Sequence, residues 1–197
     1  MDLWIATSNA GKLKEFKNMA MSSSLKIRTP KELDFYTSPA ETGDTFLANA
    51  KIKAMSLHKS LSDKNTWVLA EDSGLVVDGL DGLPGIHSAR YAGPNARDSE
   101  NNAKLFKMMG FKSPQNRKAH FHCSIFVINP EGKELHYEGK IEGTIGKKLA
   151  GTGGFGYDPL FIPEGQTQTL AELEPSFKSK NSHRSKAFKS FLADLSS

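Results

Sequence analysis

Two adjacent carboxylates follow a short apolar run, and their types and position suit them to metal-assisted chemistry. Residues 67–70 read Trp-Val-Leu-Ala, which is too short for a helix and rich in strand formers, so they predict a buried strand. Glu71 and Asp72 come next, where we expect the strand to end. In open α/β sheets ligands bind beyond the carboxyl ends of strands, so acids placed there can hold a hard cation against a phosphate.

Side-chain alternation limits what this pair of acids can do. Consecutive strand residues point to opposite faces, so only one of the two carboxylates reaches a metal unless a turn intervenes. Ser73 and Gly74 offer such a turn. The alternative is a water-facing strand end, which is the commoner role of an isolated Glu-Asp pair.

A second candidate is the sequence Ser-Asn-Ala-Gly-Lys at residues 8–12, between a predicted strand over 3–7 and a predicted helix over 12–21. Backbone N–H groups, the positive end of a helix and the Lys12 side chain meet there, which suits a phosphate. It is not a Walker A loop, because Lys12 is followed by Leu13 instead of Ser or Thr. Taken alone, the pattern also fits a plain turn with a helix-starting lysine.

Two further charged residues lie in and just before the next predicted helix. Glu41 precedes that helix and is either a second metal ligand or a favourable charge near a helix N-terminus. Lys53 lies on the helix and is either a ligand for an anion or a solvated side chain.

The C-terminal third of the chain holds the aromatic candidates. In the glycine-rich loop 151–159, residues 155–158 can stack on and hydrogen-bond a nucleobase, or their aromatic side chains can be tucked into the core. Ser182 is a good N-cap, which would place His183 and Arg184 in the first turn of a helix. The alternative for the lysine-rich stretch 178–189 is a solvated helix face.

The predicted elements that position these residues are of both kinds. Apolar spacing predicts helices that cover residues 12–21, 46–57, 95–109 and 187–195, the third closed by Gly110 as a left-handed cap. Alternation predicts a hairpin, with extended segments over 120–129 and 135–144 and a turn at 130–133. With the predicted strand over 3–7, the first of these helices makes a β-loop-α unit, and a further strand is predicted over 67–70.

Composition limits the class of protein. The 197 residues indicate one domain over 1–197, or two lobes of one fold. The 26 basic and 22 acidic residues give a net charge of +4, a mild excess that lacks the clustered polybasic tail of many nucleic-acid binders. A small polyphosphate explains the charge equally well, so we expect no nucleic-acid partner. The single cysteine, Cys123, excludes an internal disulfide and a cysteine-based zinc site and favours a reducing compartment. The chain shows neither a leader pattern nor 18 consecutive apolar residues, so we expect a soluble, cytoplasmic protein without a membrane partner.

Seven motifs occur in order along the chain: SNAGK, ETG, FLANAKIKA, AEDSGL, GLPGIHSARYAG, GGFGYDPLF and KNSHRSKA. Together they resemble the inosine triphosphate pyrophosphatases, also called XTP/dITP or non-canonical purine NTP diphosphatases, and the resemblance extends from Thr7 to Ala187. There are two departures from the pattern. Glu71 stands where many relatives have Asp, which keeps a carboxylate, and Ala48 stands where many have Glu, which removes one contributor to the metal network.

The resemblance implies an α/β fold with a mixed, elongated central sheet and flanking helices, two lobes around a nucleotide-binding cleft, and a homodimer. It also implies the roles of individual residues. Those that would bind the triphosphate are Thr7, Ser8, Asn9, Ala10, Gly11, Lys12 and Lys53. Glu41 and Asp72 would hold Mg²⁺, with Glu71 as a further candidate ligand, and Asp72 would also be the base. Ser73 would contact a phosphate or the ribose. Those that would enclose and read the base are Phe155, Gly156, Tyr157, Asp158, Lys178, His183 and Arg184.

The implied reaction is Mg²⁺-dependent hydrolysis between the α and β phosphates of ITP, dITP and XTP, which yields the monophosphate and pyrophosphate and cleanses the nucleotide pool. Two alternatives stay open. A related pyrophosphatase for modified pyrimidine or methylated nucleotides would share the chemistry with a different base pocket. An RNA-binding module would use the basic C-terminal segment and the aromatic residues, with no need for magnesium.

Overall fold

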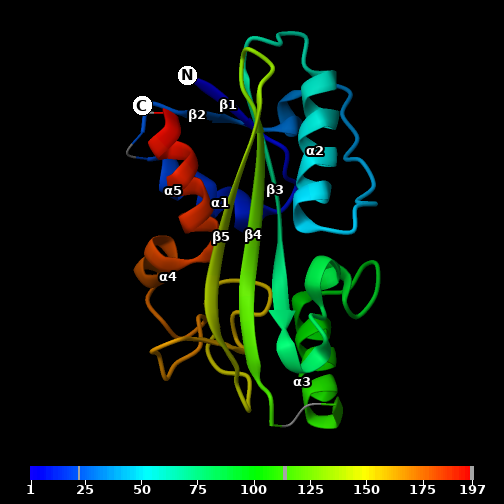
Figure 1. The fold of residues 1–197 in the computed structure, drawn as a ribbon, viewed down its shortest axis with the longest axis vertical. Helices are drawn as coiled ribbons and strands as arrows, with labels where there is room; N and C mark the ends of the chain where they lie inside the picture. The colour runs from blue at the N-terminus through cyan, green and yellow to red at the C-terminus, as the bar shows by residue number, and fades with distance from the viewer. Residues whose placement is uncertain (22, 113–114, 196–197) are drawn as a thin grey trace. The chain divides into compact units, whose positions relative to one another are not determined.

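The computed structural model describes residues 1–21, 23–112 and 115–195, which form an α/β fold (Figure 1). Within these residues, six strands form one sheet in the order β2-β1-β3-β4-β5-β6. The strands are β1 (Asp2–Ile5), β2 (Lys26–Arg28), β3 (Trp67–Val77), β4 (Lys118–Ile128), β5 (Glu134–Ile145) and β6 (Phe161–Pro163). β1 is parallel to both β2 and β3, whereas β5 and β6 are antiparallel. The predicted mixed α/β class is therefore confirmed.

Five α-helices accompany the sheet in the described residues. They are α1 (Ala10–Ala20), α2 (Phe46–Ser60), α3 (Asp98–Lys112), α4 (Pro175–Asn181) and α5 (His183–Leu195). None of the helices in this part of the chain is both long and apolar enough to cross a membrane.

Residue contacts divide the chain into two compact units. The first unit consists of Met1–Asp72, Cys123–Glu138 and Ala187–Ser197, and the second of Ser73–His122 and Gly139–Lys186. Consequently β3, β4, β5 and α5 each contribute residues to both units.

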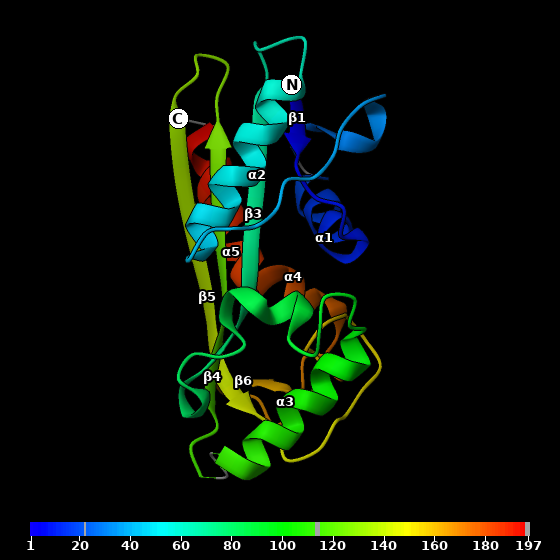
Figure 2. The ribbon, with the colours of Figure 1, turned by 90° about the vertical axis from the view of Figure 1, so that its right-hand side faces the viewer.

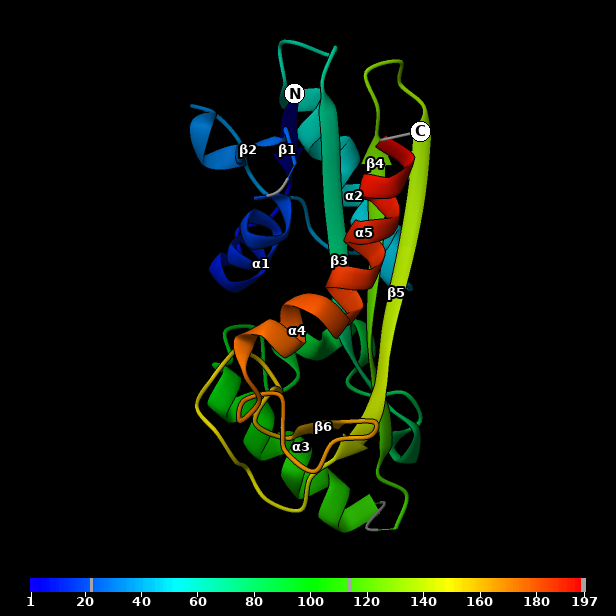
Figure 3. The same ribbon diagram turned by 90° about the vertical axis from the view of Figure 1, so that its left-hand side faces the viewer.

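In the first unit the sheet is covered on both faces. Because alternate strand residues point to opposite faces, Leu69 packs in one buried cluster with Phe16 of α1 and Phe188 of α5, whereas Val68 packs in another with Leu57 of α2. The rings of Phe16 and Phe188 meet edge to face, 5.1 Å apart. Figure 2 shows α2 on one side of these strands, and the opposite view in Figure 3 shows α1 and α5 on the other.

The second unit has a core of its own. Leu75 and Val77 at the end of β3 pack there with Leu105 and Met109 of α3. The apolar face of α3 predicted from the sequence is thus buried in the second unit.

The strand that carries the two acids is longer than predicted. β3 runs over Trp67–Val77, so Glu71 and Asp72 lie in its interior, and residues 73–74 continue the strand instead of forming a turn. The expectation that the acids mark the strand end was wrong. The physical reason is that the strand-forming residues after the acids, Leu75 among them, are needed in the core of the second unit.

Short elements and helix ends also differ from the sequence prediction. The third helix begins at Asp98 and continues through Gly110, which is an interior helical residue and not a cap. β2 and β6, at three residues each, and the seven-residue α4 were not predicted. Segments this short carry too few residues to show a period of 2 or 3.6.

Candidate active site

Residues 7–12 lead from β1 into α1, as the sequence predicts, but the helix begins at Ala10 instead of Lys12 and has a cap that was not predicted. Thr7 Oγ1 accepts a hydrogen bond from the Asn9 N–H at 3.2 Å, and Asn9 Oδ1 accepts one from the Lys12 N–H at 3.0 Å, which makes Asn9 the N-cap. The amides of Ala10 and Gly11 belong to the same first turn, whose N–H groups have no acceptor within a helix. This end of α1, with Ser8 exposed beside it, therefore suits an anion.

Glu71 is held on the side of the sheet that α1 covers. Its side chain is fully buried, and Lys12 Nζ lies 2.8 Å from its Oε1. The Cys123 thiol donates to its Oε2 at 3.5 Å. Glu71 is thus the counterion of the lysine in the predicted phosphate loop.

Asp72 points to the other face, where α2 lies. Lys53 Nζ is 3.3 Å from Asp72 Oδ1 and 2.7 Å from Glu41 Oε1, so one ammonium group contacts both carboxylates. Asn49, one helical turn before Lys53, donates to Asp72 Oδ2 at 3.3 Å. The predicted alternation of the two acids is therefore observed, and Glu41, Lys53 and Asp72 lie together in the first unit.

Burial and neighbouring charges shift the pKa values of Asp72 and Lys53. Burial is the largest effect on Asp72 and raises the pKa of its carboxyl group above the ordinary value. The ammonium groups of Lys53 and Lys12 oppose this rise in the pKa, and the carboxylates of Glu41 and Glu71 add to it. Burial also disfavours a charged Lys53, but its carboxylate neighbours outweigh burial and raise the pKa of Lys53. Asp72 is thus a stronger base than an exposed aspartate, beside a lysine that stays charged.

Sequence reasoning missed Asn49. This side chain is fully buried, and its Oδ1 accepts a hydrogen bond from the Gly43 N–H at 2.8 Å while its amide group holds Asp72. A Cβ atom at residue 43 would lie 2.9 Å from Asn49 Oδ1, so the close approach requires glycine. The available signal was a polar residue one turn before Lys53 in a helix with apolar spacing.

Glu41 and Asp72 fit the part of a magnesium site that a protein supplies when the phosphates of a substrate provide the remaining ligands. No three His, Cys, Asp or Glu side chains within residues 1–21, 23–112 and 115–195 are grouped to hold a metal. Magnesium is usually bound by one or two carboxylates plus substrate phosphates, so Glu41 and Asp72 have the number and type of side chains that such a site would need. Both already face one cationic group, Lys53 Nζ. Glu71 contacts Lys12 on the opposite face of β3, and the structure does not bring it to this pair.

In the second unit, Asp158 fixes the aromatic loop. Its Oδ2 accepts hydrogen bonds from the Phe155 N–H at 2.9 Å and from Lys178 Nζ at 2.5 Å. Lys178 Nζ also lies 4.3 Å from the centre of the Phe155 ring. A Cβ atom at Gly154 would lie 1.9 Å from Asp158 Oδ2, so this turn requires glycine. The loop therefore presents Phe155 and Lys178 in a fixed relation.

Arg184 lies in the same group. Its side chain is almost completely buried, its Nη2 donates to Ser73 Oγ at 2.9 Å, and its Cζ is 5.9 Å from the centre of the Phe155 ring. The solvated helix face considered for this stretch does not apply to Arg184.

His183 is also buried. As predicted, Ser182 caps α5 by accepting a hydrogen bond from the Ser185 N–H at 3.2 Å, and α5 begins at His183. The His183 ring stacks on Phe121 with 4.9 Å between centroids. This stacking fixes the imidazole in the second unit.

Tyr157 differs from the other aromatic candidate in the loop. Its side chain lies in the core of the second unit, and its hydroxyl donates to the Ser88 carbonyl at 2.8 Å. For Tyr157 the structure favours the alternative in which the aromatic side chain is tucked into the core. Phe155 is partly exposed, so its ring is the accessible one.

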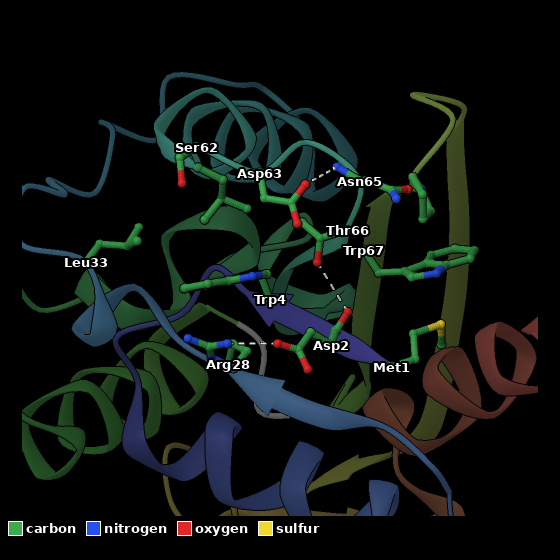
Figure 4. A pocket seen from close by; sticks show the side chains of 12 residues that line it. Met1, Asp2, Trp4, Arg28, Leu33, Ser62, Asp63, Asn65, Thr66 and Trp67 are labelled. Atoms are coloured by element: carbon green, nitrogen blue, oxygen red, sulfur yellow. Dashed lines mark hydrogen bonds and ion pairs between the residues drawn. The ribbon is translucent and has the colours of Figure 1, made fainter.

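A cavity of about 480 Å³ lies elsewhere in the first unit, and Figure 4 shows its lining. None of the predicted site residues lines it. Its arginine, Arg28, donates to Asp2 Oδ2 at 2.8 Å and lies 4.8 Å from the centre of the Trp4 ring. This cavity is separate from the lysine and carboxylate group described above.

Comparisons with known proteins agree with the motif pattern. The model of the Ham1 family matches residues 3–194. The dITP/XTP pyrophosphatase of Bdellovibrio bacteriovorus is 53% identical over 196 residues, which cover 99% of this chain and 98% of that protein. The Ham1 protein of Staphylococcus aureus has a similar structure, with a TM-score of 0.86, 37% identity and coverage of 100% of this chain and 98% of that one. A HAM1 protein from Coxiella burnetii has a TM-score of 0.89, 34% identity and the same coverage.

Proposed function

The chain belongs to the Ham1 family, and from this premise we propose that it hydrolyses the non-canonical purine nucleoside triphosphates ITP, dITP and XTP to the monophosphate and pyrophosphate. The observation that carries the proposal is the contact of Glu41 with the buried pair of Lys53 and Asp72, in a chain whose relatives are named for dITP and XTP.

Asp72 is the proposed general base. It accepts a proton from the water whose oxygen attacks the α-phosphorus, while the bond from that phosphorus to the bridging oxygen breaks and pyrophosphate departs. The raised pKa of Asp72 suits this role, because a base is most effective when its pKa approaches the working pH. Asn49 holds the second oxygen of the carboxylate and so orients Asp72.

Glu41 and Asp72 are the residues that would hold Mg²⁺, whose chemistry is to offset negative charge on phosphate oxygens. Lys53, which contacts both carboxylates, is the proposed partner of the triphosphate on this side of the sheet. Lys12 and the first amides of α1 form the other proposed phosphate contact. These positive groups stabilise the departing pyrophosphate.

Base selection is assigned to the group around Phe155. Its partly exposed ring offers a face for stacking, and Arg184 has only donors to offer. A 6-oxo purine presents an acceptor to such a residue, whereas adenine presents an amino donor. The mismatch costs about 1–3 kcal/mol, or roughly 10- to 200-fold in kcat/KM.

We further propose a cytoplasmic homodimer. The dimer rests on the resemblance noted from the motifs, and the compartment rests on the single, buried cysteine, Cys123. Light scattering after gel filtration tests the dimer, since a monomeric mass at micromolar concentration would contradict it.

A panel of nucleoside triphosphates tests the reaction. We expect ITP, dITP and XTP to be hydrolysed well above ATP, CTP and UTP, with one pyrophosphate released per monophosphate formed. Release of orthophosphate and a nucleoside diphosphate would contradict the assigned bond. A preference for methylated or modified pyrimidine nucleotides, included in the same panel, would favour the related pyrophosphatases.

A further inference from the structure

The start of α3 carries polar side chains that are too buried for a solvated helix face. Asn101 and Asn102 are each only 3% exposed, in a helix that the sequence pattern describes through its apolar residues alone. Buried amide groups need hydrogen-bond partners, and a loss of these partners is costly. The partners of these two side chains therefore show what this end of α3 does.

Asn102 and Asp98 together hold one residue of the aromatic loop. Asn102 Nδ2 donates to the Gly156 carbonyl at 2.8 Å and to the Asp98 carbonyl at 2.8 Å. Asp98 Oδ2 accepts a hydrogen bond from the Gly156 N–H at 2.6 Å. Both backbone groups of Gly156, whose φ is +63°, are thus fixed by side chains from α3.

Asn101 makes equivalent bonds to a different segment. Its Nδ2 donates to the Ala89 carbonyl at 3.2 Å, and its Oδ1 accepts from the Ala92 N–H at 2.8 Å. Two neighbouring, equally buried asparagines therefore hold two separate segments of the second unit. This division offers a control within one helix.

We propose that Asp98 and Asn102 are positioning residues that set base selectivity by holding the loop at Gly156. Gly156 lies between Phe155, which carries the ring face, and Asp158, which holds Lys178 against that ring. With Gly156 fixed from outside the loop, the ring keeps its place relative to Arg184 in the same unit. The inference rests on the proposed function, in which Phe155 and Arg184 receive the base.

Release of Gly156 lets the Phe155 ring move relative to Arg184. Such movement weakens the match to a 6-oxo group more than it affects phosphate contacts, which every nucleotide shares. Asn102→Ala and Asp98→Ala should therefore each lower the ITP/ATP ratio of kcat/KM by about tenfold, mainly through a higher KM for ITP. Asp98→Asn retains an oxygen acceptor for the Gly156 N–H and should restore the ratio to within about twofold of wild type.

Asn101→Ala is the matched control. It removes an equally buried amide from the same turn of α3, so its melting temperature should fall about as much as that of Asn102→Ala, while its ITP/ATP ratio stays at the wild-type value. Because Asp98 is exposed, Asp98→Ala keeps the measurement available if Asn102→Ala does not fold.

Three results decide the matter. An unchanged ratio in the folded Asn102 and Asp98 variants would overturn the inference. An equal fall of the ratio in Asn101→Ala would also overturn it, because the contacts would then act only through the general stability of α3.

Phe155→Ala separates this inference from the proposed function. If Phe155→Ala leaves the ratio unchanged, the proposed base site fails; if it lowers the ratio and Asn102→Ala does not, only the positioning role fails.

Discussion

Neighbouring acids in β3 differ because consecutive strand side chains point to opposite faces. Glu71 is fully buried against Lys12 and Cys123, whereas Asp72 lies with Lys53 and Asn49. Asp72→Asn keeps the shape but removes the base and an anionic metal ligand. We expect turnover of ITP at saturating Mg²⁺ to fall by at least about 10²-fold with an unchanged melting temperature.

Glu71→Gln is the matched comparison. It leaves Asp72 intact and removes only the negative charge beside Lys12, so the loss of turnover should be smaller than in Asp72→Asn. Equal losses in the two variants would show that both carboxylates act in the reaction itself.

The two lysines should affect all substrates alike, because phosphates are common to every nucleotide. Charge-assisted hydrogen bonds contribute about 1.5–3 kcal/mol, so Lys12→Ala and Lys53→Ala should each lower kcat/KM by about 10- to 150-fold. The measurement compares ITP with XTP. A loss that depends on the base would argue against phosphate contacts for these lysines.

A test of Arg184 needs a substitution that keeps most of the volume of this buried side chain. Truncation to alanine would leave a cavity, since this side chain is among the largest that are fully buried, so Arg184→Met is preferable. We expect the ITP/ATP ratio of kcat/KM to fall by about 10- to 200-fold. Ser73→Ala removes the hydrogen bond to Arg184 but keeps the guanidinium, and should retain most of the ratio. An unchanged ratio in Arg184→Met would remove Arg184 from base recognition.

At the scale of elements, local pattern predicted those parts whose partners are close in sequence. The cap of α1 joins Asn9 to Lys12, three residues apart, and the cap of α5 joins Ser182 to Ser185. The Ser182 cap was predicted from residue propensity, whereas around Asn9 the strand, turn and helix were predicted without the cap itself. The residue roles around these elements came from the motif resemblance and not from the periodicity.

Contacts that depend on the tertiary fold were not predictable in this way. The bond from Asn49 to Asp72 spans 23 residues, and the bond from Gly156 to Asp98 spans 58. The extent of β3 was missed for the same reason, because the residues after the acids are strand residues only by virtue of the core they join. Tertiary packing overrides local preference at such positions.

The C-terminal helix offers a prediction of pH dependence. The Tyr137 hydroxyl of β5 donates to Asp194 Oδ2 of α5 at 2.9 Å, and burial, followed by this bond and the Asp194 charge, raises the pKa of Tyr137 from 10.0 to about 12. Since the proton is held more tightly in the folded state, the stabilisation is fully present below the unfolded pKa and is lost as pH rises through the folded one.

The measurement is the free energy of unfolding of wild type and Tyr137→Phe, followed by urea denaturation across the alkaline range. Below pH 10.0 we expect the free energy of unfolding of wild type to exceed that of Tyr137→Phe, and this difference should disappear as pH approaches about 12. A difference that does not change with pH would show that the hydroxyl contributes only packing.

At the scale of the whole molecule, the net charge does not distinguish between two kinds of anionic partner. A net charge of +4 is compatible with a polyphosphate or with RNA, and the two make opposite demands on metal and salt. With only Glu41 and Asp72 available as the proposed carboxylate ligands, the affinity for magnesium should depend on the substrate phosphates that complete its shell. ITP should therefore tighten Mg²⁺ binding, and EDTA should abolish turnover while leaving the melting temperature of the free protein unchanged.

Addition of excess Mg²⁺ should restore turnover, and binding of a non-hydrolysable ITP analogue should require the metal. A nucleic-acid-binding module would behave differently. It would bind RNA in EDTA, and its affinity would fall steeply between about 50 and 200 mM salt because condensed counterions are released on binding. Full ITP hydrolysis in EDTA would contradict the roles given to Glu41 and Asp72. Metal-independent, salt-sensitive binding of RNA without any ITP turnover would instead make the basic C-terminal segment, and not Glu41 and Asp72, the functional part of the molecule.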